Sequence, residues 1–359
     1  MFPKKRIYIN APNIRHGGGL ILLEMILKAA QSLDFSISGN LNAVLKEYED
    51  FSSNNKKSIE FSESGLSNYL FPIGNKKQYL QEKEQICLYF GNLPPISKTK
   101  GTSVLYIHNK LLLEPVFKYK LNFKTRFRLV FEKLFIILFY KNVDFIVVQT
   151  PSMKRLSNKI LKRRKTISIP FFDFKEDLQD KNKSGHFDFF YPSYGYTYKN
   201  HKNLILAFNL LSKKNIFPTI VMALDSKIDN KLIAFIREQI KKNGLKIKLV
   251  LDQNFEDMNQ YYNSCDALVW PSLTDSLGMP LIEASAKEKD ILASDLEYIH
   301  DILEIKKEDC FNPYDPLLIA DCLENYLSKQ NKEVKNHEVK IKIFTSKEFL
   351  NKLTSLTLK

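Results

Sequence analysis

Residues 271–286 have the sequence PSLTDSLGMPLIEASA, which places the carboxylates of Asp275 and Glu283 on either side of a Gly-Met-Pro corner. Gly278 permits a tight backbone turn and Pro280 suits the first turn of a helix, so we expect a loop that passes into a helix here. The free N–H groups of such a corner can bind phosphate oxygens. The stretch therefore predicts an anion-binding corner between two acidic residues.

The two carboxylates can be interpreted in two ways. A carboxylate accepts hydrogen bonds from two hydroxyl groups at once, as a ribose or pyranose diol requires. Asp275 and Glu283 would then bracket a diphosphate site with hydroxyl-binding groups, which is the arrangement that a nucleotide-sugar needs. The alternative for Glu283 is a structural role near the helix start, where the helix dipole stabilises a negative charge.

Short apolar runs of strand length alternate with helix-like segments through most of the chain. This alternation predicts parallel sheets joined by right-handed crossovers, and 359 residues are enough for two hydrophobic cores. We therefore predict an α/β chain with two Rossmann-like domains that face each other across a cleft. The predicted parts are an N-terminal domain (1–174), a polar linker (175–186), a C-terminal domain (187–335) and a last helical segment (336–359), for which packing on the N-terminal domain is one option.

The composition is that of a globular protein with a marked positive charge. Lys and Arg number 54 against 40 Asp and Glu, which gives a net charge of +14, and 44% of the residues are hydrophobic. A positive charge suits a nucleic acid, an anionic membrane or a phosphorylated substrate. The basic residues are dispersed and no nucleic-acid-binding motif is present, so we expect no nucleic-acid partner.

Cysteine usage and apolar runs bear on the compartment. Cys87, Cys265, Cys310 and Cys322 show neither a CxxC motif nor zinc-ligand spacing, so we expect unpaired structural thiols in a reducing compartment. No signal peptide is evident, and the apolar run at 129–140 falls short of the ~20 residues of a membrane-spanning helix. The predicted location is the cytoplasm, with peripheral contact to the inner face of the cytoplasmic membrane as an option.

The segment 118–141 alternates cations with Phe, Leu and Tyr, as helices at membrane surfaces do. An anionic membrane surface is therefore a candidate partner for this segment. A buried helix with a solvated basic face is the alternative interpretation.

Three further loops follow predicted strands, and ligands of doubly wound sheets bind at the carboxyl ends of strands. The first loop contains Gly18 and Gly19, which lack a Cβ and let the backbone approach a ligand closely. A flexible turn is the alternative, and the dinucleotide fingerprint GxGxxG is not matched because Leu22 stands where its third glycine belongs.

The other two loops carry His108 and Lys199. His108 lies just past a strand, where a catalytic and a structural role are both open. The ammonium of Lys199 could meet a diphosphate as a point charge. A solvated basic loop is the alternative, and we assign that role to Lys202.

The block PSLTDSLGMPLIEASAKEKDILASD at 271–295 resembles the signature of the retaining glycosyltransferases of family 4, which have the two-domain GT-B fold. In that signature an acidic residue is followed by seven residues and a glutamate, and Asp275 and Glu283 stand at these positions. KNHKNLILAFNLL and HGGGLILLEMIL resemble segments of the family's donor domain and first domain. The similarity covers most of the chain, and FGNLPP, YIHNK and DFIVVQTPSM resemble bacterial members that build surface polysaccharides.

The resemblance implies roles for the C-terminal residues. Glu283 would bind the nucleotide ribose, and Asp275, which replaces the usual glutamate, would bind hydroxyls of the donor sugar. Backbone N–H groups of Gly278 and Met279 would contact sugar or phosphate. Lys199 would neutralise the departing diphosphate.

The resemblance also implies roles for the N-terminal residues. Gly18 and Gly19 would approach the donor from the other domain, and His108 would lie beside the transferred sugar. The arginine that the family usually has shortly before the lysine is absent. Ser193 or Tyr194 stands there, and Ser193 is counted with the donor-binding residues.

The implied function is a retaining glycosyltransferase of hexosyltransferase type, which moves a sugar from a nucleoside-diphosphate-sugar to a growing cell-surface glycan on a lipid carrier. Such a glycan would belong to a lipopolysaccharide, O-antigen or capsule. No D-x-D motif occurs, so neither a metal nor another cofactor is expected. The alternatives are a GT-B nucleotide-sugar epimerase or hydrolase, a basic nucleic-acid-binding protein, and an inactive scaffold. Donor base, sugar, acceptor, linkage and oligomeric state stay open.

Overall fold

The computed structural model describes residues 6–42, 59–62, 85–162, 165–174, 185–224, 230–252, 255–329 and 337–356. The chain divides into two compact units. Unit 1 comprises Met1–Lys118, Asn122–Asp173 and Lys342–Lys359, and unit 2 comprises Tyr119–Leu121 and Phe174–Ile341. Most of the predicted linker (175–184) lies outside the described residues.

Unit 1 is built on a parallel sheet whose seven described strands have the order β3-β2-β1-β4-β5-β6-β7. Strand β4 is buried along its whole length, as expected of a parallel strand covered on both faces. The described strands are β1 (Arg6–Ala11), β2 (Ser36–Asn42), β3 (Ile59–Ser62), β4 (Gln85–Tyr89), β5 (Thr102–Ile107), β6 (Phe145–Val148) and β7 (Lys165–Ser168).

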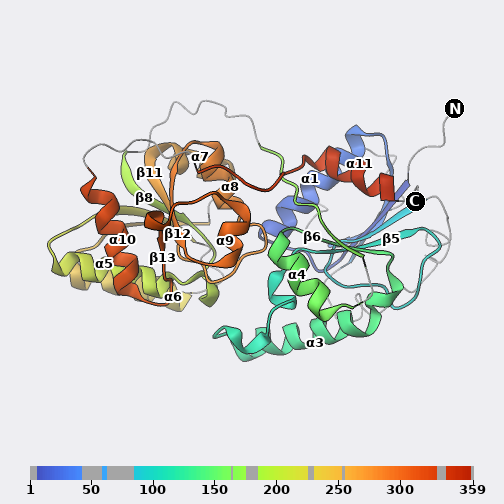
Figure 1. The fold of residues 1–359 in the computed structure, drawn as a ribbon, viewed down its shortest axis with the longest axis horizontal. Helices are drawn as coiled ribbons and strands as arrows, with labels where there is room; N and C mark the ends of the chain where they lie inside the picture. Colours follow the sequence, from blue (N-terminus) through green and yellow to red (C-terminus); the bar gives the residue numbers. More distant parts are fainter. Residues whose placement is uncertain are drawn as a thin grey trace. The chain divides into compact units, whose positions relative to one another are not determined.

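The α-helices described in unit 1 are α1 (Gly18–Ser32), α3 (Phe123–Phe139), α4 (Pro151–Ile160) and α11 (Ser346–Leu356). Helix α4 begins at a cap formed by Thr150, whose hydroxyl accepts a hydrogen bond from the Met153 N–H at 3.5 Å, and Pro151 is its first residue. Figure 1 shows α11, in red, beside α1, in blue. Phe349 of α11 is fully buried and stacks on Phe171, with ring centroids 4.3 Å apart.

Unit 2 has a second parallel sheet, whose six described strands have the order β10-β9-β8-β11-β12-β13. The strands are β8 (Phe187–Pro192), β9 (Thr219–Leu224), β10 (Lys246–Leu251), β11 (Cys265–Trp270), β12 (Asp290–Ser294) and β13 (Cys310–Phe311). The α-helices described in unit 2 are α5 (His201–Lys213), α6 (Asn230–Asn243), α7 (Phe255–Ser264), α8 (Met279–Ala286), α9 (Glu297–Ile302) and α10 (Pro316–Ser328). Helix α10 packs beside α5 (Figure 1).

The prediction of two parallel α/β domains is confirmed, but strands β2, β3 and β13 and helix α10 were not predicted. Strand β2 has the sequence SISGNLN, whose Ser, Gly and Asn residues are poor strand formers in isolation. Its position beside β1 explains the sequence, because a Cβ on Gly39 would lie 2.3 Å from the Ile9 carbonyl oxygen. Helix α10 was also missed; it begins at a cap formed by Asp315, whose side chain accepts a hydrogen bond from the Leu317 N–H at 2.9 Å.

Helix α3 occupies most of the apolar and basic segment at 118–141. Within the described part of the chain, no helix combines the length and the apolar character that crossing a membrane requires.

The packing of α11 leads to a stability prediction. Phe349→Ala removes a fully buried ring that also contacts Tyr106, with centroids 5.5 Å apart, so we expect a loss of about 3–5 kcal/mol in the free energy of unfolding. Urea denaturation measures this loss. Lys347→Ala changes an exposed residue of the same helix and should stay within about 0.5 kcal/mol of wild type. Equal stability of both variants would show that α11 is not part of the unit 1 core.

Candidate active site

A lysine and an aspartate form an ion pair at the carboxyl-end edge of the unit 2 sheet. Lys199 follows β8 and Asp275 follows β11, and these two strands are parallel neighbours. The Lys199 Nζ lies 2.8 Å from both carboxylate oxygens of Asp275 and 4.7 Å from the centroid of the Trp270 ring. The side chains keep 11% and 18% exposure, so the pair is largely desolvated and still open to a ligand.

The backbone around Lys199 is fixed by neighbouring polar groups. The buried Tyr191 hydroxyl donates a hydrogen bond to the Lys199 carbonyl oxygen. The next residue, Asn200, has a left-handed φ of 64°, and its amide donates to the carbonyl oxygens of Pro271 at 3.1 Å and Pro313 at 2.7 Å. These bonds tie the loop after β8 to the loop after β11, so the ion pair sits on a rigid frame.

The predicted corner is present between Asp275 and helix α8. Gly278 has a φ of 62°, and a Cβ there would lie 2.8 Å from the Leu281 side chain, so both the conformation and the space favour glycine. Met279 and Pro280 are the first two residues of α8. The N–H groups at the start of a helix have no intrahelical acceptor, so the corner offers donors to an anion.

Glu283 is not a cap of α8, so the capping interpretation of this residue is wrong. It is the fifth residue of the helix, and the first turn contains no acidic residue. Its carboxylate instead accepts a hydrogen bond from the Tyr262 hydroxyl of α7 at 2.6 Å. Burial raises the pKa of Glu283 to about 7, although the Tyr262 hydrogen bond and the charge of Lys287 oppose this shift.

Two neighbours of the ion pair differ in how they are held. Ser193 is buried, its N–H donates to the Ala223 carbonyl oxygen at 3.0 Å, and its hydroxyl donates to the Tyr194 carbonyl oxygen at 3.4 Å. His201 is buried beside the Tyr191 ring, with centroids 4.8 Å apart, and neither ring nitrogen has a hydrogen-bond partner among the described residues. Burial, and then the charge of Lys199, lower the pKa of His201 to about 3, so this ring stays neutral.

A second polar cluster lies in unit 1, around His108 at the end of β5. The side-chain oxygen of Asn92 accepts from the N–H groups of His108 at 2.8 Å and Asn109 at 3.1 Å, which directs its amide nitrogen to the His108 Nε2 at 3.0 Å. Nε2 therefore accepts, and the proton of the neutral ring is on Nδ1. Burial lowers the pKa of His108 to about 4, so the ring is neutral at pH 7.

The loop that contains Gly18 and Gly19 packs against the His108 ring. A Cβ on Gly19 would lie 2.6 Å from the His108 Cε1, so only glycine fits beside the ring. Gly17 precedes α1 with a φ of 72°, and Gly18 is the first residue of the helix. The structure thus brings Gly18, Gly19 and His108 together within unit 1.

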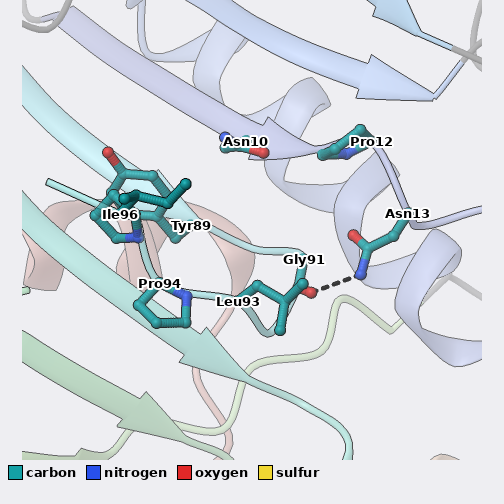
Figure 2. A pocket seen from close by; sticks show the side chains of 9 residues that line it. Asn10, Pro12, Asn13, Tyr89, Gly91, Leu93, Pro94 and Ile96 are labelled. Atoms are coloured by element: carbon teal, nitrogen blue, oxygen red, sulfur yellow. Dashed lines mark hydrogen bonds between the residues drawn. The ribbon is translucent and has the colours of Figure 1, made fainter. Parts of the chain in front are cut away.

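A small pocket opens next to this cluster at the carboxyl ends of β1 and β4. The Asn13 side chain donates a hydrogen bond to the Gly91 carbonyl oxygen at 2.6 Å and closes one side of the pocket (Figure 2). The lining residues are Asn10, Pro12, Asn13, Tyr89, Gly91, Leu93, Pro94, Pro95 and Ile96. Its lining combines apolar side chains with the amide groups of Asn10 and Asn13.

The sequence analysis did not identify the residues that hydrogen-bond to, or pack against, the predicted site residues. Tyr262, Trp270, Tyr191 and Asn92 each contact a predicted site residue, but they lie 8 to 71 positions away from it in the sequence. Aromatic residues in strands and helices are ordinary core residues by pattern. Only the tertiary structure shows which site residue each of them contacts.

The raised pKa of Glu283 leads to a prediction for stability. A carboxyl group whose pKa is higher in the folded than in the unfolded chain stabilises the fold fully below the ordinary value of 4.5 and loses this contribution as the pH rises through about 7. We therefore expect the free energy of unfolding of wild type, measured relative to Glu283→Gln, to fall by about 3 kcal/mol over this range.

Urea denaturation at a series of pH values measures this difference. Glu238→Gln, which changes an exposed glutamate of α6, serves as the control and should give a curve parallel to that of wild type. A difference between wild type and Glu283→Gln that does not change with pH would contradict the raised pKa.

Comparisons with known proteins bear on the family and the fold. Residues 173–342 match the model of the family Glycosyl transferases group 1. No curated protein matches the chain.

Several solved structures are similar over nearly the whole chain. HepE of Anabaena, in complex with UDP and glucose, has 14% identity and a TM-score of 0.65, with 99% of this chain and 97% of that chain covered. Sucrose-phosphate synthase from Thermosynechococcus elongatus has the same identity, coverage and score. TarM has 12% identity and a TM-score of 0.68, with 100% and 99% covered. At these identities the similarity shows the fold, which is GT-B. Residues 173–342 therefore resemble a group 1 glycosyl transferase domain, and the chain has the GT-B fold.

Proposed function

We propose that the protein transfers a sugar from a nucleoside-diphosphate-sugar to a hydroxyl group of a cell-surface glycan, with retention of the anomeric configuration. The observation that carries this proposal is the Lys199–Asp275 pair beside Trp270, at the carboxyl-end edge of the domain that matches the group 1 family. HepE of Anabaena has been solved with UDP-glucose, so a UDP-sugar is the first donor to test.

Each of the site residues in unit 2 has a proposed role in donor binding. Glu283, when ionised, accepts the ribose hydroxyls, and the backbone N–H groups of Gly278 and Met279 bind phosphate or sugar oxygens. Asp275 accepts the hydroxyls of the transferred sugar, and Lys199 binds the diphosphate. A diphosphate carries more negative charge than one carboxylate, so Lys199 can turn to it while Asp275 exchanges the ammonium for hydroxyl donors.

The proposed reaction is a front-face substitution assisted by the leaving group. The bond between the sugar's anomeric carbon and the diphosphate oxygen breaks, the acceptor oxygen bonds to the same face of that carbon, and the acceptor proton passes to the diphosphate. Lys199 stabilises the charge that develops on the departing diphosphate, and the rigid frame behind it keeps the ammonium in place. In this proposal neither a metal nor another cofactor takes part.

Unit 1 supplies the second set of proposed roles. Gly18 and Gly19 offer backbone N–H groups at the start of α1, and His108 hydrogen-bonds to the transferred sugar. Because the His108 ring is neutral, it can donate or accept a hydrogen bond without adding charge to the site. Ser193 stays a proposed donor contact through its hydroxyl, which donates to the Tyr194 carbonyl oxygen at 3.4 Å and also interacts with the Tyr191 hydroxyl.

The proposed acceptor is a lipid-linked glycan, reached at an anionic membrane surface through α3. The alternative of a buried helix does not fit, because only Leu129, Phe135 and Ile136 of α3 are buried. Its outer face is apolar, with Phe123 82% exposed and Leu138 70% exposed. The other exposed apolar residues of the helix are Phe127, Val130, Leu134 and Ile137.

The charge of α3 supports an anionic surface. Lys124 and Arg128 are exposed on the same helix, and Arg126 lies over the Phe117 ring at 5.2 Å. Apolar side chains that enter the lipid and cations that meet the headgroups are the two features of an interfacial helix. A purely electrostatic partner would use the cations but not the exposed aliphatic side chains.

Lys199→Ala tests the proposed donor site. We expect kcat/KM for the release of nucleoside diphosphate to fall ten-fold or more, because a loss of about 1.4 kcal/mol in transition-state stabilisation has that effect. Lys202→Ala, which changes an exposed lysine in the first turn of α5, should leave the rate near that of wild type. Equal losses in both variants would refute the role of Lys199. Release that does not depend on added acceptor would favour the hydrolase or epimerase alternative.

Charge reversal on α3 tests the membrane surface. The triple variant Lys124→Glu, Arg126→Glu and Arg128→Glu should lose co-sedimentation with vesicles that contain anionic phospholipid. The same charge change on α6, at Lys231, Lys241 and Lys242, is the matched control and should leave vesicle binding unchanged. Loss of binding in both triple variants would mean that net charge, rather than α3, directs the protein to the lipid.

A further inference from the structure

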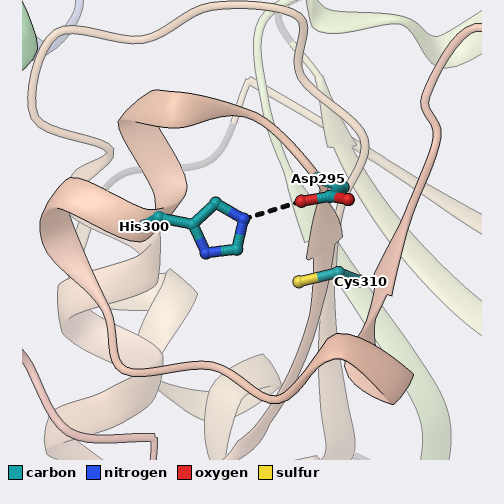
Figure 3. A group of neighbouring side chains, drawn as sticks. All are labelled: Asp295, His300 and Cys310. Carbon is teal, nitrogen blue, oxygen red and sulfur yellow. Dashed lines mark hydrogen bonds and ion pairs between the residues drawn. The ribbon is translucent and has the colours of Figure 1, made fainter.

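Three side chains of different chemistry meet in unit 2, and none of them has a role in the proposed transfer. Asp295 directly follows β12, His300 lies in α9, and Cys310 begins β13 (Figure 3). One carboxylate oxygen, one ring nitrogen and the sulfur all lie within 4.8 Å of one another. The His300 Nε2 is 2.7 Å from the Asp295 Oδ1.

The backbone brings these residues together. Cys310 pairs with Ala293 in the parallel ladder of β12 and β13, and the Asp295 N–H donates to the Phe311 carbonyl oxygen at 2.7 Å. Asp295 and Cys310 are therefore held at the same end of two paired strands. The short helix α9 then turns the chain so that His300 faces Asp295, as Figure 3 shows.

A surface ion pair explains only part of this cluster. The His300 and Asp295 side chains are 43% and 55% exposed, and exposed pairs contribute little to stability. Such a pair has no need of a thiol, whereas Cys310 points toward it from the neighbouring strand (Figure 3). The sulfur therefore adds a third type of ligand atom at the edge that β12 and β13 share.

The ligand set selects the kind of cation. Thiolate and imidazole groups favour zinc over the hard cations Mg²⁺ and Ca²⁺, which prefer oxygen ligands. Zinc bonds of about 2.0 Å to nitrogen or oxygen and about 2.3 Å to sulfur place tetrahedral ligands roughly 3.3–3.6 Å apart. The three atoms are already within 4.8 Å of one another, so small side-chain rotations are enough to reach that geometry.

We propose that Asp295, His300 and Cys310 bind one Zn²⁺ ion, with a water molecule in the fourth position. On binding, the Cys310 thiol gives its proton to solvent and the sulfur binds as a thiolate, while His300 binds as the neutral imidazole. One carboxylate and one thiolate then balance the two positive charges of the ion. The ion joins the ends of β12 and β13 to α9, so it stabilises this edge of the domain and takes no part in the proposed sugar transfer.

Cobalt substitution tests the site on the full-length chain. After treatment with a chelator, wild type should bind one equivalent of Co²⁺ with the absorption band of a cobalt–thiolate bond, and Zn²⁺ should displace the cobalt. Cys310→Ser should lose the band and bind Zn²⁺ at least ten-fold more weakly. Cys322→Ser, which removes a buried thiol of the same unit, should behave as wild type.

Thermal unfolding supplies the second readout. Zn²⁺ should raise the melting temperature of wild type and of Cys322→Ser, because a ligand that binds only the folded state stabilises it. Zn²⁺ should not raise the melting temperature of His300→Gln, which changes a half-exposed side chain and leaves the thiol in place. A wild-type cobalt complex without the thiolate band, or Cys310→Ser and His300→Gln variants that bind Zn²⁺ as tightly as wild type, would overturn the proposal.

Discussion

The parallel pairing of β8 with β11 is the constraint on which the donor site depends. Because both strands point in the same direction, the loops that follow them leave the sheet at one edge, and residues 76 positions apart meet there as Lys199 and Asp275. Asn200 strengthens this arrangement, since its side chain bonds carbonyl groups of two other loops. Removing one member of the pair would leave the other charge largely buried and unpaired, which would destabilise this edge of the sheet.

Burial controls the charge of the polar groups in both units. His108 is kept neutral by its low pKa, while Glu283 has a pKa near 7 and changes its ionisation close to physiological pH. Tyr262 opposes the effect of burial on Glu283, because its hydroxyl donates to the carboxylate and stabilises the ionised form. In the proposed donor complex, this balance determines whether Glu283 is an acceptor for ribose hydroxyls or a neutral acid.

The surface features separate into two kinds. Helix α3 presents apolar and basic side chains together, which fits a lipid surface better than a purely electrostatic partner. The cluster of Asp295, His300 and Cys310 is small and chemically mixed, which fits a single soft cation. The two proposals use different residues and different measurements, so the failure of one would leave the other intact.

The sequence by itself determined the two parallel α/β domains, because strand-length and helix-length patterns are local and the Gly278 corner is specified by residue type. It also pointed to Lys199, Asp275 and Glu283 as chemical groups. Only the tertiary structure decided their partners. A sequence pattern does not show which strands pair, so it gave no sign that Lys199 meets Asp275 or that Tyr262 meets Glu283. The same reason applies to Cys310: no local zinc spacing is present, and strand pairing alone brings its sulfur near Asp295 and His300.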